Sequence, residues 1–446
     1  MKLSELCSTL REIRVSPVKS LGQNFLHDRN LARWIVDKAD LTADDYVVEI
    51  GPGLGALTEF ELDSQARVLA IEKDRRLAEF LRNRFANERF EILHSDALTF
   101  DLRQLFAKPR VKVLGNLPYY IASQLLIKFT KYPSPISLWL FMLQDEMARR
   151  ISAQPRSKDY GALTLLIQIH CRVEYLRTVP ANLFFPRPDV DSAFVRISQR
   201  PAGELPDHDP ETVARIVRKG FSQRRKQLRN LLSEDFSDWD AAADATGFDP
   251  RARAEELTLE QWITLSNLIH QKEAMEKPPE SREDLSVVDD QDQVTGTAAR
   301  FEVHGNNLRH RAVHILIFDH LNQVFLQKRS RWKDRHPGLW DSSAAGHVNA
   351  GEEYEAAANR ELAEELGIRA RLNPVIKLPA SENTGHEFIW LYQARHDGPF
   401  DLARSEIEYG DFFPAEIISG WLAARPIDFA PGFVECWRAY RETASL

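Results

Sequence analysis

Short apolar runs alternate with helical patterns from Tyr46 to Leu143, and this alternation limits the possible folds more than any other feature of the chain. The expected strands are Tyr46–Ile50, Arg67–Glu72, Phe90–Leu93, Val111–Gly115 and Ser137–Leu143. Between them, Leu77–Phe85 and Ile121–Phe129 have the apolar spacing of helices. Strands that alternate with helices usually pair in parallel, so we predict an α/β fold whose parallel sheet is covered by helices on both faces.

The pattern changes after this region, as expected for a chain of 446 residues, which is too long for one ordinary domain. Residues 1–200 are predicted to form a first domain, and residues 201–272, with apolar positions at helical spacing, a small helical subdomain. Residues 273–300 are polar, acidic and nearly free of large apolar side chains, so we predict a flexible linker. Residues 301–446 are then a separate second domain.

The second domain begins with a strand pattern and continues with a helical one. Val313–Phe318 and Gln323–Gln327 resemble the two strands of a hairpin. The pattern of Glu355–Leu366 predicts a helix that ends at Gly367. We find no internal repeat.

Composition excludes several classes of protein. Hydrophobic residues make up 43% and charged residues 28% of the chain, which is typical of a folded globular protein rather than a disordered one. The three cysteines, Cys7, Cys171 and Cys436, are too far apart to predict a disulfide framework or a zinc cluster. The first residues lack the apolar stretch of a signal peptide, and no run approaches the roughly 20 apolar residues that span a bilayer. We therefore expect a cytoplasmic protein.

Charge is unevenly distributed beneath the net value of −8. Residues 101–230 hold 22 Lys and Arg against 11 Asp and Glu, whereas residues 271–446 hold 20 against 29. A concentrated positive excess suggests a polyanionic partner. An arginine-rich surface that is simply solvated explains the same excess, and charge alone does not separate the two.

A glycine-rich turn, Glu49–Gly55, follows the first expected strand and opens a helix. Glycines there permit a tight turn and let a ligand lie against bare backbone. Glu72 ends the next strand, where a carboxylate can hold two ribose hydroxyls, and Asp96 follows the third, where it can meet an adenine edge. The glycines also satisfy the loose dinucleotide-binding pattern, so a dinucleotide-dependent oxidoreductase and an S-adenosylmethionine enzyme both fit these residues.

The tetrapeptide Asn116–Tyr119, directly after the fourth strand, favours methyl transfer. The exocyclic nitrogen of adenine is a poor nucleophile because its lone pair is delocalised into the ring. The Asn116 side-chain oxygen and a neighbouring backbone carbonyl can accept its two N–H bonds and so turn the nitrogen toward an electrophilic methyl group. Tyr119 can stack on the base, and Pro118 can rigidify the turn. A packed tyrosine in a simple Asn-Pro turn is the alternative for the tetrapeptide alone.

Residues 1 to about 270 resemble the small-subunit ribosomal RNA adenine dimethyltransferases. The matching segments are Gly22–Leu26, Glu49–Thr58, Asn116–Tyr119, Phe141–Gln144, Phe185–Val195 and Phe221–Asn230. The resemblance implies a Rossmann-like, S-adenosylmethionine-dependent methyltransferase sheet with a small C-terminal helical subdomain. Enzymes that methylate large-subunit RNA share the catalytic turn, but the segment Phe221–Asn230 favours the small-subunit branch.

The same resemblance assigns roles to individual residues. S-adenosylmethionine would be held by Asn24, Leu26, Gly51, Gly53, Glu72, Asp96 and Asn116, and the catalytic turn would be Asn116, Leu117, Pro118 and Tyr119. The implied substrate is 16S rRNA in the immature small subunit, where two adjacent adenosines of the 3′-terminal hairpin each receive two methyl groups. Tyr120 departs from the family pattern, in which we expect Asn, and this affects the shape of the pocket rather than the chemistry.

Basic residues beside this site predict the RNA contact. They are Arg218, Lys219, Arg224, Arg225, Lys226 and Arg229, together with Arg149, Arg150, Arg156 and Lys158. Lysine and arginine contacts to phosphate supply affinity, whereas a flipped base supplies selectivity. A ribosome-assembly factor that binds RNA and whose methylation is dispensable is the alternative from another functional class.

A second constellation lies in residues 346–368. Five residues separate Gly346 from Glu352, and seven separate Glu352 from Arg360. The next residue is Glu361, and Glu361, Glu364 and Glu365 share one helix face, where three carboxylates repel one another unless a cation joins them. Hard divalent cations with oxygen ligands remove this repulsion and bind a diphosphate. An acidic, solvent-facing helix is the alternative for the carboxylates alone.

These residues resemble the Nudix box, and the resemblance covers roughly residues 301–446. It implies an α/β/α Nudix domain in which Glu361, Glu364 and Glu365 hold Mg2+ or Mn2+ and Arg360 orients one of the acids. Glu352 would be a structural or outer carboxylate. The implied reaction is water attack on a nucleoside diphosphate linked to another group. A Nudix module that only binds its ligand is the alternative.

The stretch before the box also resembles the isopentenyl diphosphate isomerases of the same superfamily. The similar segments are Gln327–Ser330 and Trp340–His347. Those enzymes need a cysteine for proton transfer where this chain has Ala345. The missing thiol argues against isomerisation and for hydrolysis.

Overall fold

The computed structural model describes residues 2–17, 23–131, 133–201, 203–275, 283–330, 333 and 335–444. It divides the chain into two compact units, Met1–Lys272 and Glu273–Leu446, and each is described by itself. Gly22, which opens one of the matching segments, lies outside the described residues.

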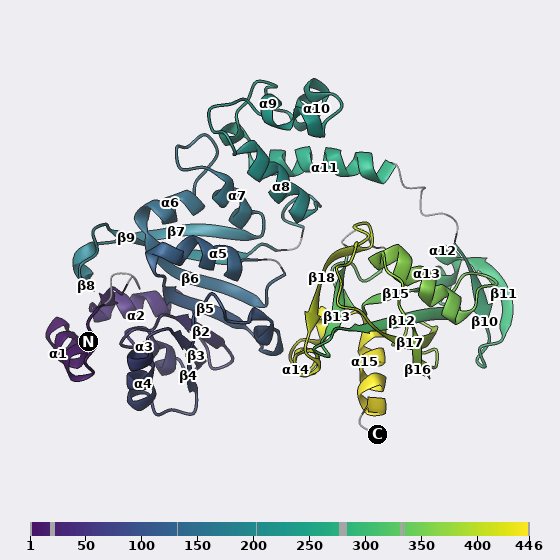
Figure 1. Cartoon of the computed structure of the whole chain (residues 1–446), viewed down its shortest axis with the longest axis horizontal. Helices are drawn as coiled ribbons and strands as arrows, with labels where there is room; N and C mark the ends of the chain where they lie inside the picture. The colour runs from purple at the N-terminus through teal and green to yellow at the C-terminus, as the bar shows by residue number, and fades with distance from the viewer. Residues whose placement is uncertain are drawn as a thin grey trace. The chain divides into compact units, whose positions relative to one another are not determined.

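The first unit is built on a seven-stranded sheet (Figure 1). Its strands, in spatial order, are β4 (Phe90–His94), β3 (Arg67–Glu72), β2 (Tyr46–Ile50), β5 (Val111–Asn116), β6 (Ile136–Gln144), β9 (Ser192–Gln199) and β7 (Cys171–Val179). The five strands from β4 to β6 pair in parallel, which confirms the predicted strands and their orientation. Two strands that were not predicted extend the sheet, and they are antiparallel: β9 runs antiparallel to β6, and β7 antiparallel to β9.

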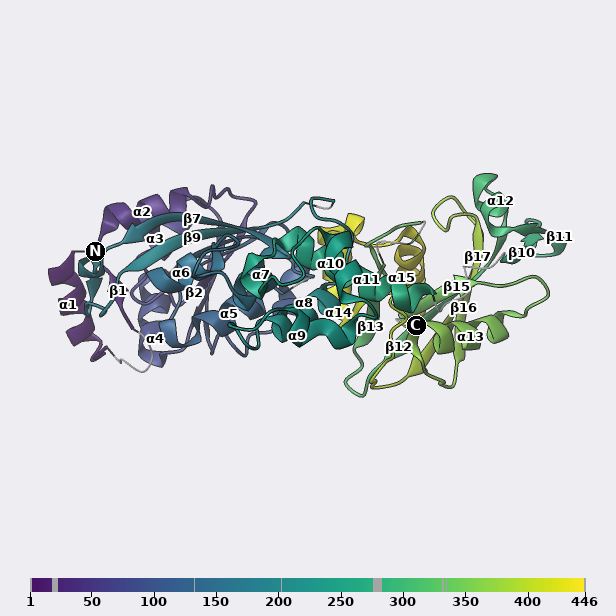
Figure 2. The ribbon, with the colours of Figure 1, turned by 90° about the horizontal axis from the view of Figure 1, so that it is seen from above.

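Helices cover both faces of this sheet, as predicted (Figure 2). In β6, Trp139 and Phe141 pack on one face, and Leu138 and Leu140 on the other, because successive side chains of a strand point in opposite directions. One face is covered by α5 (Ala122–Phe129), α6 (Asp145–Ile151) and α7 (Ala162–Gln168), and the other by α2 (Arg29–Asp37) and α3 (Thr58–Asp63). A sheet covered in this way has buried strands that read as nearly continuous apolar runs.

Four helices follow the sheet and form the predicted small helical part. They are α8 (Pro210–Gly220), α9 (Arg229–Leu232), α10 (Trp239–Thr246) and α11 (Leu259–Met275). Asp209 caps α8 by accepting hydrogen bonds from the N–H groups of Glu211 and Thr212. The core of this part contains Trp262 and also Tyr160, from the segment between α6 and α7, so the helices pack against the first 200 residues rather than standing alone.

The second unit contains a seven-stranded mixed sheet. The order is β14 (Trp340–Asp341), β13 (Val324–Arg329), β12 (His310–Phe318), β17 (Glu387–Arg395) and β16 (Asn373–Leu378), with β15 (Ala344–His347) on β12 and β18 (Ile407–Phe413) on β13. The antiparallel pairing of β12 with β13 confirms the predicted hairpin. The predicted helix is α13 (Tyr354–Leu366), and Gly367 ends it in the left-handed conformation. The helices α12 (Arg300–Gly305), α14 (Ala415–Ala424) and α15 (Pro431–Ala444) complete the unit.

The segment expected to be a linker is partly folded, so that prediction is wrong from residue 284 onward. β10 (Asp284–Val288) and β11 (Val294–Ala299) form an antiparallel hairpin. Asp289 closes the turn by accepting hydrogen bonds from the N–H groups of Gln291 and Gln293. Leu285 is buried, and its backbone bridges to Asn349. A few apolar side chains and a well-formed turn therefore order a stretch whose composition is polar.

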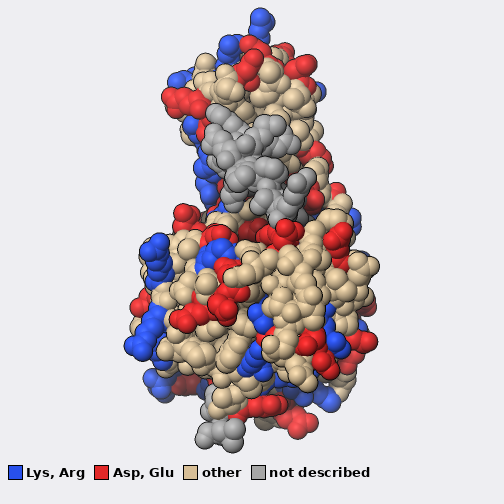
Figure 3. Space-filling model, turned by 90° about the vertical axis from the view of Figure 1, so that its right-hand side faces the viewer, with Lys and Arg blue, Asp and Glu red and all other residues tan. Residues whose placement is uncertain are grey.

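Charges of both signs mix on the face of the molecule that Figure 3 draws. On the face of the molecule drawn in Figure 3, Asp and Glu side chains alternate with Lys and Arg and form no single large patch. Within the described residues, no helix combines the length and the apolar character needed to cross a membrane.

Candidate active sites

The carboxyl ends of the parallel strands β2 to β5 meet at one edge of the sheet, and the glycine turn begins there. Gly51, Gly53 and Gly55 have φ values of +66°, +59° and +80°, a backbone conformation that residues with a Cβ atom rarely adopt. A Cβ atom at position 53 would lie 3.0 Å from the Phe25 ring. Bare backbone therefore faces the space beside β2, as a ligand that lies against the turn requires.

Glu72 ends β3 beneath this turn and is buried. Its Oε2 accepts a hydrogen bond from the Gly53 N–H at 3.3 Å, and its Oε1 accepts one from the Asp74 N–H at 2.8 Å. Burial raises the pKa of the Glu72 carboxyl to about 7, although the two N–H groups act in the opposite direction. The Glu72 carboxyl group, which the sequence predicts to bind ribose, thus contacts the backbone of the glycine turn.

Asp96 follows β4 and has a partner that the sequence analysis did not name. Lys73 Nζ lies 2.8 Å from Asp96 Oδ2, and the Leu98 N–H donates to Asp96 Oδ1 at 2.9 Å. Partial burial opposes ionisation, but the Lys73 ammonium and the Leu98 N–H lower the pKa of Asp96 below its ordinary value. Asp96 is therefore an anion and a hydrogen-bond acceptor at neutral pH.

Asn116 is the last residue of β5, and its side chain is oriented by a hydrogen bond. Its Nδ2 donates to the Asn24 carbonyl oxygen at 2.9 Å, which leaves Oδ1 as an acceptor. The backbone of the next residue is also held, because the Leu117 N–H donates to the Met142 carbonyl oxygen at 3.1 Å. The turn after β5 is thus tied to β6 and to the segment that contains Asn24.

Most of the predicted cofactor residues surround one cavity. Its lining includes Asn24, Gly51, Gly53, Glu72, Asp96, Asn116 and Pro118. Among the predicted residues that the structure describes, Leu26, Leu117 and Tyr119 do not line it. Leu26 pairs with Phe184 between the short strands β1 (Phe25–Leu26) and β8 (Phe184–Phe185), and the Leu117 side chain is in the core. A bare glycine backbone, two carboxyl groups and an amide around one cavity suit a nucleoside-containing cofactor such as S-adenosylmethionine.

The two tyrosines of the turn after β5 differ in position. Tyr119 shares a 2.7 Å hydrogen bond with the Ser192 hydroxyl, and burial raises the pKa of its phenol. Tyr120 is half exposed and lines the cavity that contains Asn116. The residue that departs from the family pattern therefore contributes to the wall of the predicted cofactor pocket.

The carboxylates of the second site lie on α13 as their spacing predicts. Glu361 and Glu365 are 9% and 3% exposed, whereas the side chain of Glu364 is 60% exposed. Gly346, in β15, lies directly against Glu361, and a Cβ atom there would overlap the Glu361 carboxyl group. The glycine is therefore required by packing, because any larger residue would displace the acid.

Arg360 connects the acids of this site. Its Nε and Nη2 donate to the two oxygens of Glu352, both at 3.0 Å. Its Nη1 donates to Glu361 at 2.7 Å and to Glu364 at 3.1 Å, and its Nη2 also donates to the His347 carbonyl oxygen at 2.9 Å. Burial opposes ionisation of Glu352, but these bonds lower its pKa below the ordinary value. One guanidinium group thus orients three carboxylates, where the sequence predicted one.

Glu365 is the most buried acid of the set. Its Oε2 accepts hydrogen bonds from the Ala345 N–H at 3.1 Å and from Gln327 Nε2 at 3.2 Å. Burial, followed by the nearby Glu361 charge, raises the pKa of Glu365 to about 8, and burial also raises the pKa of Glu361. Three crowded acids supply the oxygen-rich donor set that a hard divalent cation suits, so these residues fit Mg2+ or Mn2+.

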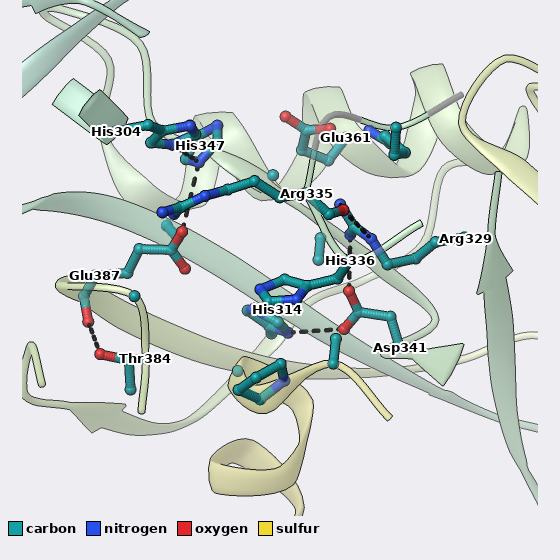
Figure 4. A pocket seen from close by; sticks show the side chains of 18 of the residues that line it. His304, His314, Arg329, Arg335, His336, Asp341, His347, Glu361, Thr384 and Glu387 are labelled. Atoms are coloured by element: carbon teal, nitrogen blue, oxygen red, sulfur yellow. Dashed lines mark hydrogen bonds and ion pairs between the residues drawn. The ribbon is translucent and has the colours of Figure 1, made fainter. Parts of the chain in front are cut away.

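A cavity of about 690 Å³ lies over these acids (Figure 4). Glu361, Glu364 and Glu365 form part of its wall, and cationic side chains form another part. Those cations are Arg300, Arg329, Lys333 and Arg335. Arg329 is held by Asp341, with its Nη1 2.8 Å from Asp341 Oδ2. A cavity of this volume holds a small molecule, and the mixture of acids and cations suits a phosphorylated one that binds with a metal ion.

Models of known families match both parts of the chain. The model of the family described as ribosomal RNA adenine dimethylase matches residues 16–271, more than half of the chain. The chain belongs to the ribosomal RNA adenine dimethylase family. The model of the NUDIX domain matches residues 308–431, so a Nudix domain follows the dimethylase in the same chain. The dimethylase unit, as we call Met1–Lys272 from here on, carries the first site, and the Nudix domain carries the second.

Named relatives resemble the dimethylase unit. A protein named ribosomal RNA small subunit methyltransferase A from Chlorobium phaeobacteroides is 41% identical over 255 residues, which cover 57% of this chain and 94% of the relative. The protein of the same name from Geobacillus thermodenitrificans is 39% identical and covers 56% and 90%. The solved structure of the 23S rRNA methyltransferase ErmE is 29% identical, with a TM-score of 0.47, over 56% of this chain and all of that one.

The basic residues of the dimethylase unit that are expected to bind RNA differ in whether an acidic side chain already lies beside them. Lys219 Nζ lies 2.7 Å from Asp235, Arg229 Nη1 lies 3.4 Å from Asp240, and Arg224 Nε lies 3.9 Å from Glu255. The second group, Arg218, Arg225 and Lys226, is exposed and makes no ion pair among the described residues. Four further predicted residues, Arg149, Arg150, Arg156 and Lys158, lie in and after α6, where Arg149 pairs with Asp145 and Arg150 with Glu146.

Several residues near the two sites were not found from the sequence. Lys73 and Ser192 contact predicted site residues of the dimethylase unit across separate strands. In the Nudix domain, His304, His310, His347 and Glu387 gather in one group. His304, His347 and Glu387 line the same cavity as the acids of α13. Their positions in the sequence are irregular, so only the pairing of strands reveals that they lie together.

Proposed function

We propose that the dimethylase unit transfers methyl groups from S-adenosylmethionine to the exocyclic nitrogens of two adjacent adenosines in the 3′-terminal hairpin of 16S rRNA. The substrate is the immature small ribosomal subunit, in the cytoplasm. The observation that carries this proposal is the position of Asn116, which shares one cavity with the glycine turn, Glu72 and Asp96. The names of the relatives reported above support the small-subunit substrate.

The chemistry required of the protein is orientation rather than covalent catalysis. S-adenosylmethionine supplies an electrophilic methyl group when bound. Asn116 Oδ1 and the Leu117 carbonyl oxygen accept the two N–H bonds of adenine, so that the nitrogen lone pair points toward the methyl group. The Tyr119 ring stacks on the base, and its hydrogen bond to Ser192 holds the phenol end of the ring in position. No strong base is needed, because the nitrogen becomes acidic only after methylation.

The test is incubation of the full-length protein with immature small subunits and a labelled methyl donor, followed by mapping of the modified bases. Dimethyladenosine at two neighbouring positions of the 3′-terminal hairpin is the expected product. Label in large-subunit RNA would instead favour the large-subunit enzymes. Normal subunit assembly by an Asn116→Ala variant that leaves the RNA unmethylated would favour the alternative, an assembly factor whose methylation is dispensable.

We also propose that the Nudix domain hydrolyses a nucleoside diphosphate linked to another group. Glu361, Glu364 and Glu365 would hold Mg2+ or Mn2+, and the metal ion would neutralise the diphosphate and activate water. The arrangement that carries the proposal is the set of acids bridged by Arg360 at the wall of a cavity that also contains cations. Arg329 and Lys333 would bind phosphate oxygens there.

A panel of nucleoside diphosphate derivatives, incubated with the full-length protein and Mg2+, tests this activity. Release of a nucleoside monophosphate that is lost in a Glu365→Gln variant is expected. Binding of the same compounds without release of product would indicate a module that only binds its ligand. Ala345 in the place of a proton-transferring thiol leads us to expect no isomerisation of isopentenyl diphosphate.

A further inference from the structure

The first turn of helix α15 lies at the wall of the Nudix cavity and has no side chain that caps it. Ala430, Pro431 and Gly432 line the cavity, and the helix, which begins at Pro431 and has 14 residues, carries no acid in its first turn. Ala430 precedes the helix and accepts a hydrogen bond from the Val434 N–H at 3.2 Å, but its methyl group cannot accept one. The N–H groups of Gly432 and Phe433 have no acceptor among the residues that the structure describes. Two free donors and the positive end of the helix dipole are therefore available to the cavity.

His314, on β12, is a buried polar side chain directed at this helix end. Its side chain is 7% exposed, and it lines the cavity. A Cβ atom added at Gly432 would lie 3.4 Å from both Cε1 and Nε2 of the His314 ring, so this edge of the ring faces the backbone of the first turn. The polar contacts of the ring within the described residues go through Nδ1, which leaves Nε2 without a partner there. Figure 4 shows His314 beside Asp341 and next to the start of the pale yellow helix.

The Nε2 atom of His314 carries a proton, because the hydrogen bond of a neighbouring serine requires it. The fully buried Ser342 hydroxyl lies 2.7 Å from His314 Nδ1. This is the one hydrogen bond of that hydroxyl among the described residues, so its proton has an acceptor only if it is donated to Nδ1. Nδ1 is then unprotonated, and the neutral ring holds its own proton on Nε2. His314 thus presents an N–H donor toward the first turn of α15.

We propose that His314 and the first turn of α15 form an oxyanion subsite, which binds a phosphate or carboxylate group that the Nudix substrate carries in addition to its diphosphate. Helix N-terminal N–H groups and an imidazole N–H are donors that suit such a group. Asp341 lies 3.7 Å from His314 Nδ1, but its charge is balanced by Arg329, whose Nη1 is 2.8 Å from Asp341 Oδ2. The inference rests on the proposed hydrolysis of a diphosphate in this cavity, and it narrows the substrate to one with a second anionic group.

The oxyanion subsite adjoins the acids of α13 through one pair of residues. His314 pairs with Ala345 across the antiparallel strands β12 and β15, and the Ala345 N–H donates to Glu365 Oε2 at 3.1 Å. The Cβ atoms of directly paired residues lie about 5 Å apart on the same face of a sheet. Ala345 and Gly432 are both small, so they leave space on two sides of the imidazole. One compact substrate can therefore place its diphosphate at the acids and its second anion at His314.

Pairs of nucleoside diphosphate compounds that differ in one anionic group test the proposal. Coenzyme A has a phosphate that dephospho-coenzyme A lacks, and UDP-glucuronate has a carboxylate where UDP-glucose has a hydroxymethyl group. The affinity of the full-length protein for each compound is measured with Ca2+ in place of Mg2+. We expect the anionic member of at least one pair to bind about tenfold more tightly than its neutral partner. The pair that shows the preference distinguishes a phosphate from a carboxylate.

Variants of His314 connect this preference to the subsite. His314→Leu removes the donor from a side chain of similar size, so the preference should fall to about twofold or less, with the affinity for the neutral member nearly unchanged. His314→Gln, whose amide can donate in place of the ring N–H, should restore part of the preference. His304→Leu removes an imidazole from another part of the cavity wall and should keep the preference. Circular dichroism checks that each variant is folded.

Equal affinity for both members of each pair, failure of all four compounds to bind, or a preference that persists in His314→Leu would overturn the proposal. An equal loss of affinity for both members in His314→Leu would place the diphosphate itself at His314 and would also contradict it. The measurement does not depend on turnover. A preference that requires His314, without release of nucleoside monophosphate in Mg2+, would contradict the proposed hydrolysis alone, whereas hydrolysis without the preference would contradict the subsite alone.

Discussion

Gly346 lies so close beneath Glu361 that a single added methyl group would occupy the position of the Glu361 carboxyl group. Glu361 is also held from above by Arg360, at 2.7 Å. Backbone on one side and a guanidinium group on the other therefore confine this acid, and neither constraint depends on a bound ion.

A Gly346→Ala variant should lose hydrolysis of its diphosphate substrate, by about a hundredfold, because a displaced ligand misplaces the ion and the attacking water. Overpacking at this position should also lower the free energy of unfolding by about 1–3 kcal/mol. Substrate turnover and thermal melting measure the two effects. Gly296→Ala is the matched control, because no atom lies within 4 Å of a Cβ atom added there. Equal activity of the two variants would show that Glu361 is not confined in this way.

An Asn116→Ala variant should reduce methyl transfer by about a hundredfold or more, because the adenine nitrogen loses the acceptor that orients it. The side chain is at the end of β5, and within the described residues it makes one hydrogen bond, to the Asn24 carbonyl oxygen, so the melting temperature should change little. Methylation of immature subunits measures the rate. Asn83→Ala, on the exposed side of α4 (Arg75–Arg84), makes the same chemical change away from the cavity and should be fully active.

Replacement of Tyr119 separates the role of its ring from that of its hydroxyl. Tyr119→Phe keeps the stacking ring and removes the bond to Ser192, so methyl transfer should fall less than about tenfold. Tyr119→Ala removes the ring and should cost much more, since stacking on one base is worth about 1–3 kcal/mol. A phenylalanine variant as inactive as the alanine variant would assign the essential role to the hydroxyl, against our expectation. Ser192→Ala should behave like Tyr119→Phe.

Exposed basic residues without ion pairs should contribute more to RNA affinity than the paired ones. Arg225→Ala and Lys226→Ala should each weaken binding and reduce the slope of affinity against salt concentration, on logarithmic scales, by about one. Lys219→Ala should change both less, because Asp235 already lies 2.7 Å from its ammonium group. Binding to a 16S hairpin at several salt concentrations gives the slopes. Arg82→Ala, an exposed change on α4, controls for net charge. If Arg82→Ala weakened RNA binding as much as Arg225→Ala, a localised contact would be contradicted.

The buried acids Glu49 and Glu61 should make the stability of the dimethylase unit depend on pH. Burial raises the pKa of Glu49 from 4.5 to about 7 and that of Glu61 well above its ordinary value. The folded state thus binds protons more tightly than the unfolded state, so the free energy of unfolding is highest when both acids are protonated. It should fall as the pH rises from about 4.5 through 7.

Glu61→Met removes one of the two acids and should flatten this pH dependence. Near pH 8 the variant should be more stable than the wild type, because it no longer buries a second carboxyl group away from water. Denaturant unfolding at pH 5 and pH 8 tests the sign. Glu79→Gln, at an exposed position of α4, serves as the control and should follow the wild type. A steeper loss of stability for the Glu61→Met variant would mean that the buried pair is not the source.

Features that depend on neighbours in the chain were predictable. The strands β2 to β6 and the helix α13 follow from apolar periodicity, and Glu361, Glu364 and Glu365 share a face because helical spacing requires it. The cofactor cavity was anticipated because parallel strands separated by helices bring their carboxyl ends to one edge of the sheet. The ordered hairpin β10–β11 was missed because composition conceals a few well-placed apolar side chains.

The sequence alone therefore predicted the local elements and the two segments that carry the candidate sites. Tertiary structure decided the contacts that join residues far apart in the chain. It placed the antiparallel strands β9 and β7 at the sheet edge, Ser192 beside Tyr119, and His304, His310, His347 and Glu387 around one point. The physical reason is that a repeating backbone geometry makes short-range positions periodic, whereas strand pairing and register depend on which buried faces fit together.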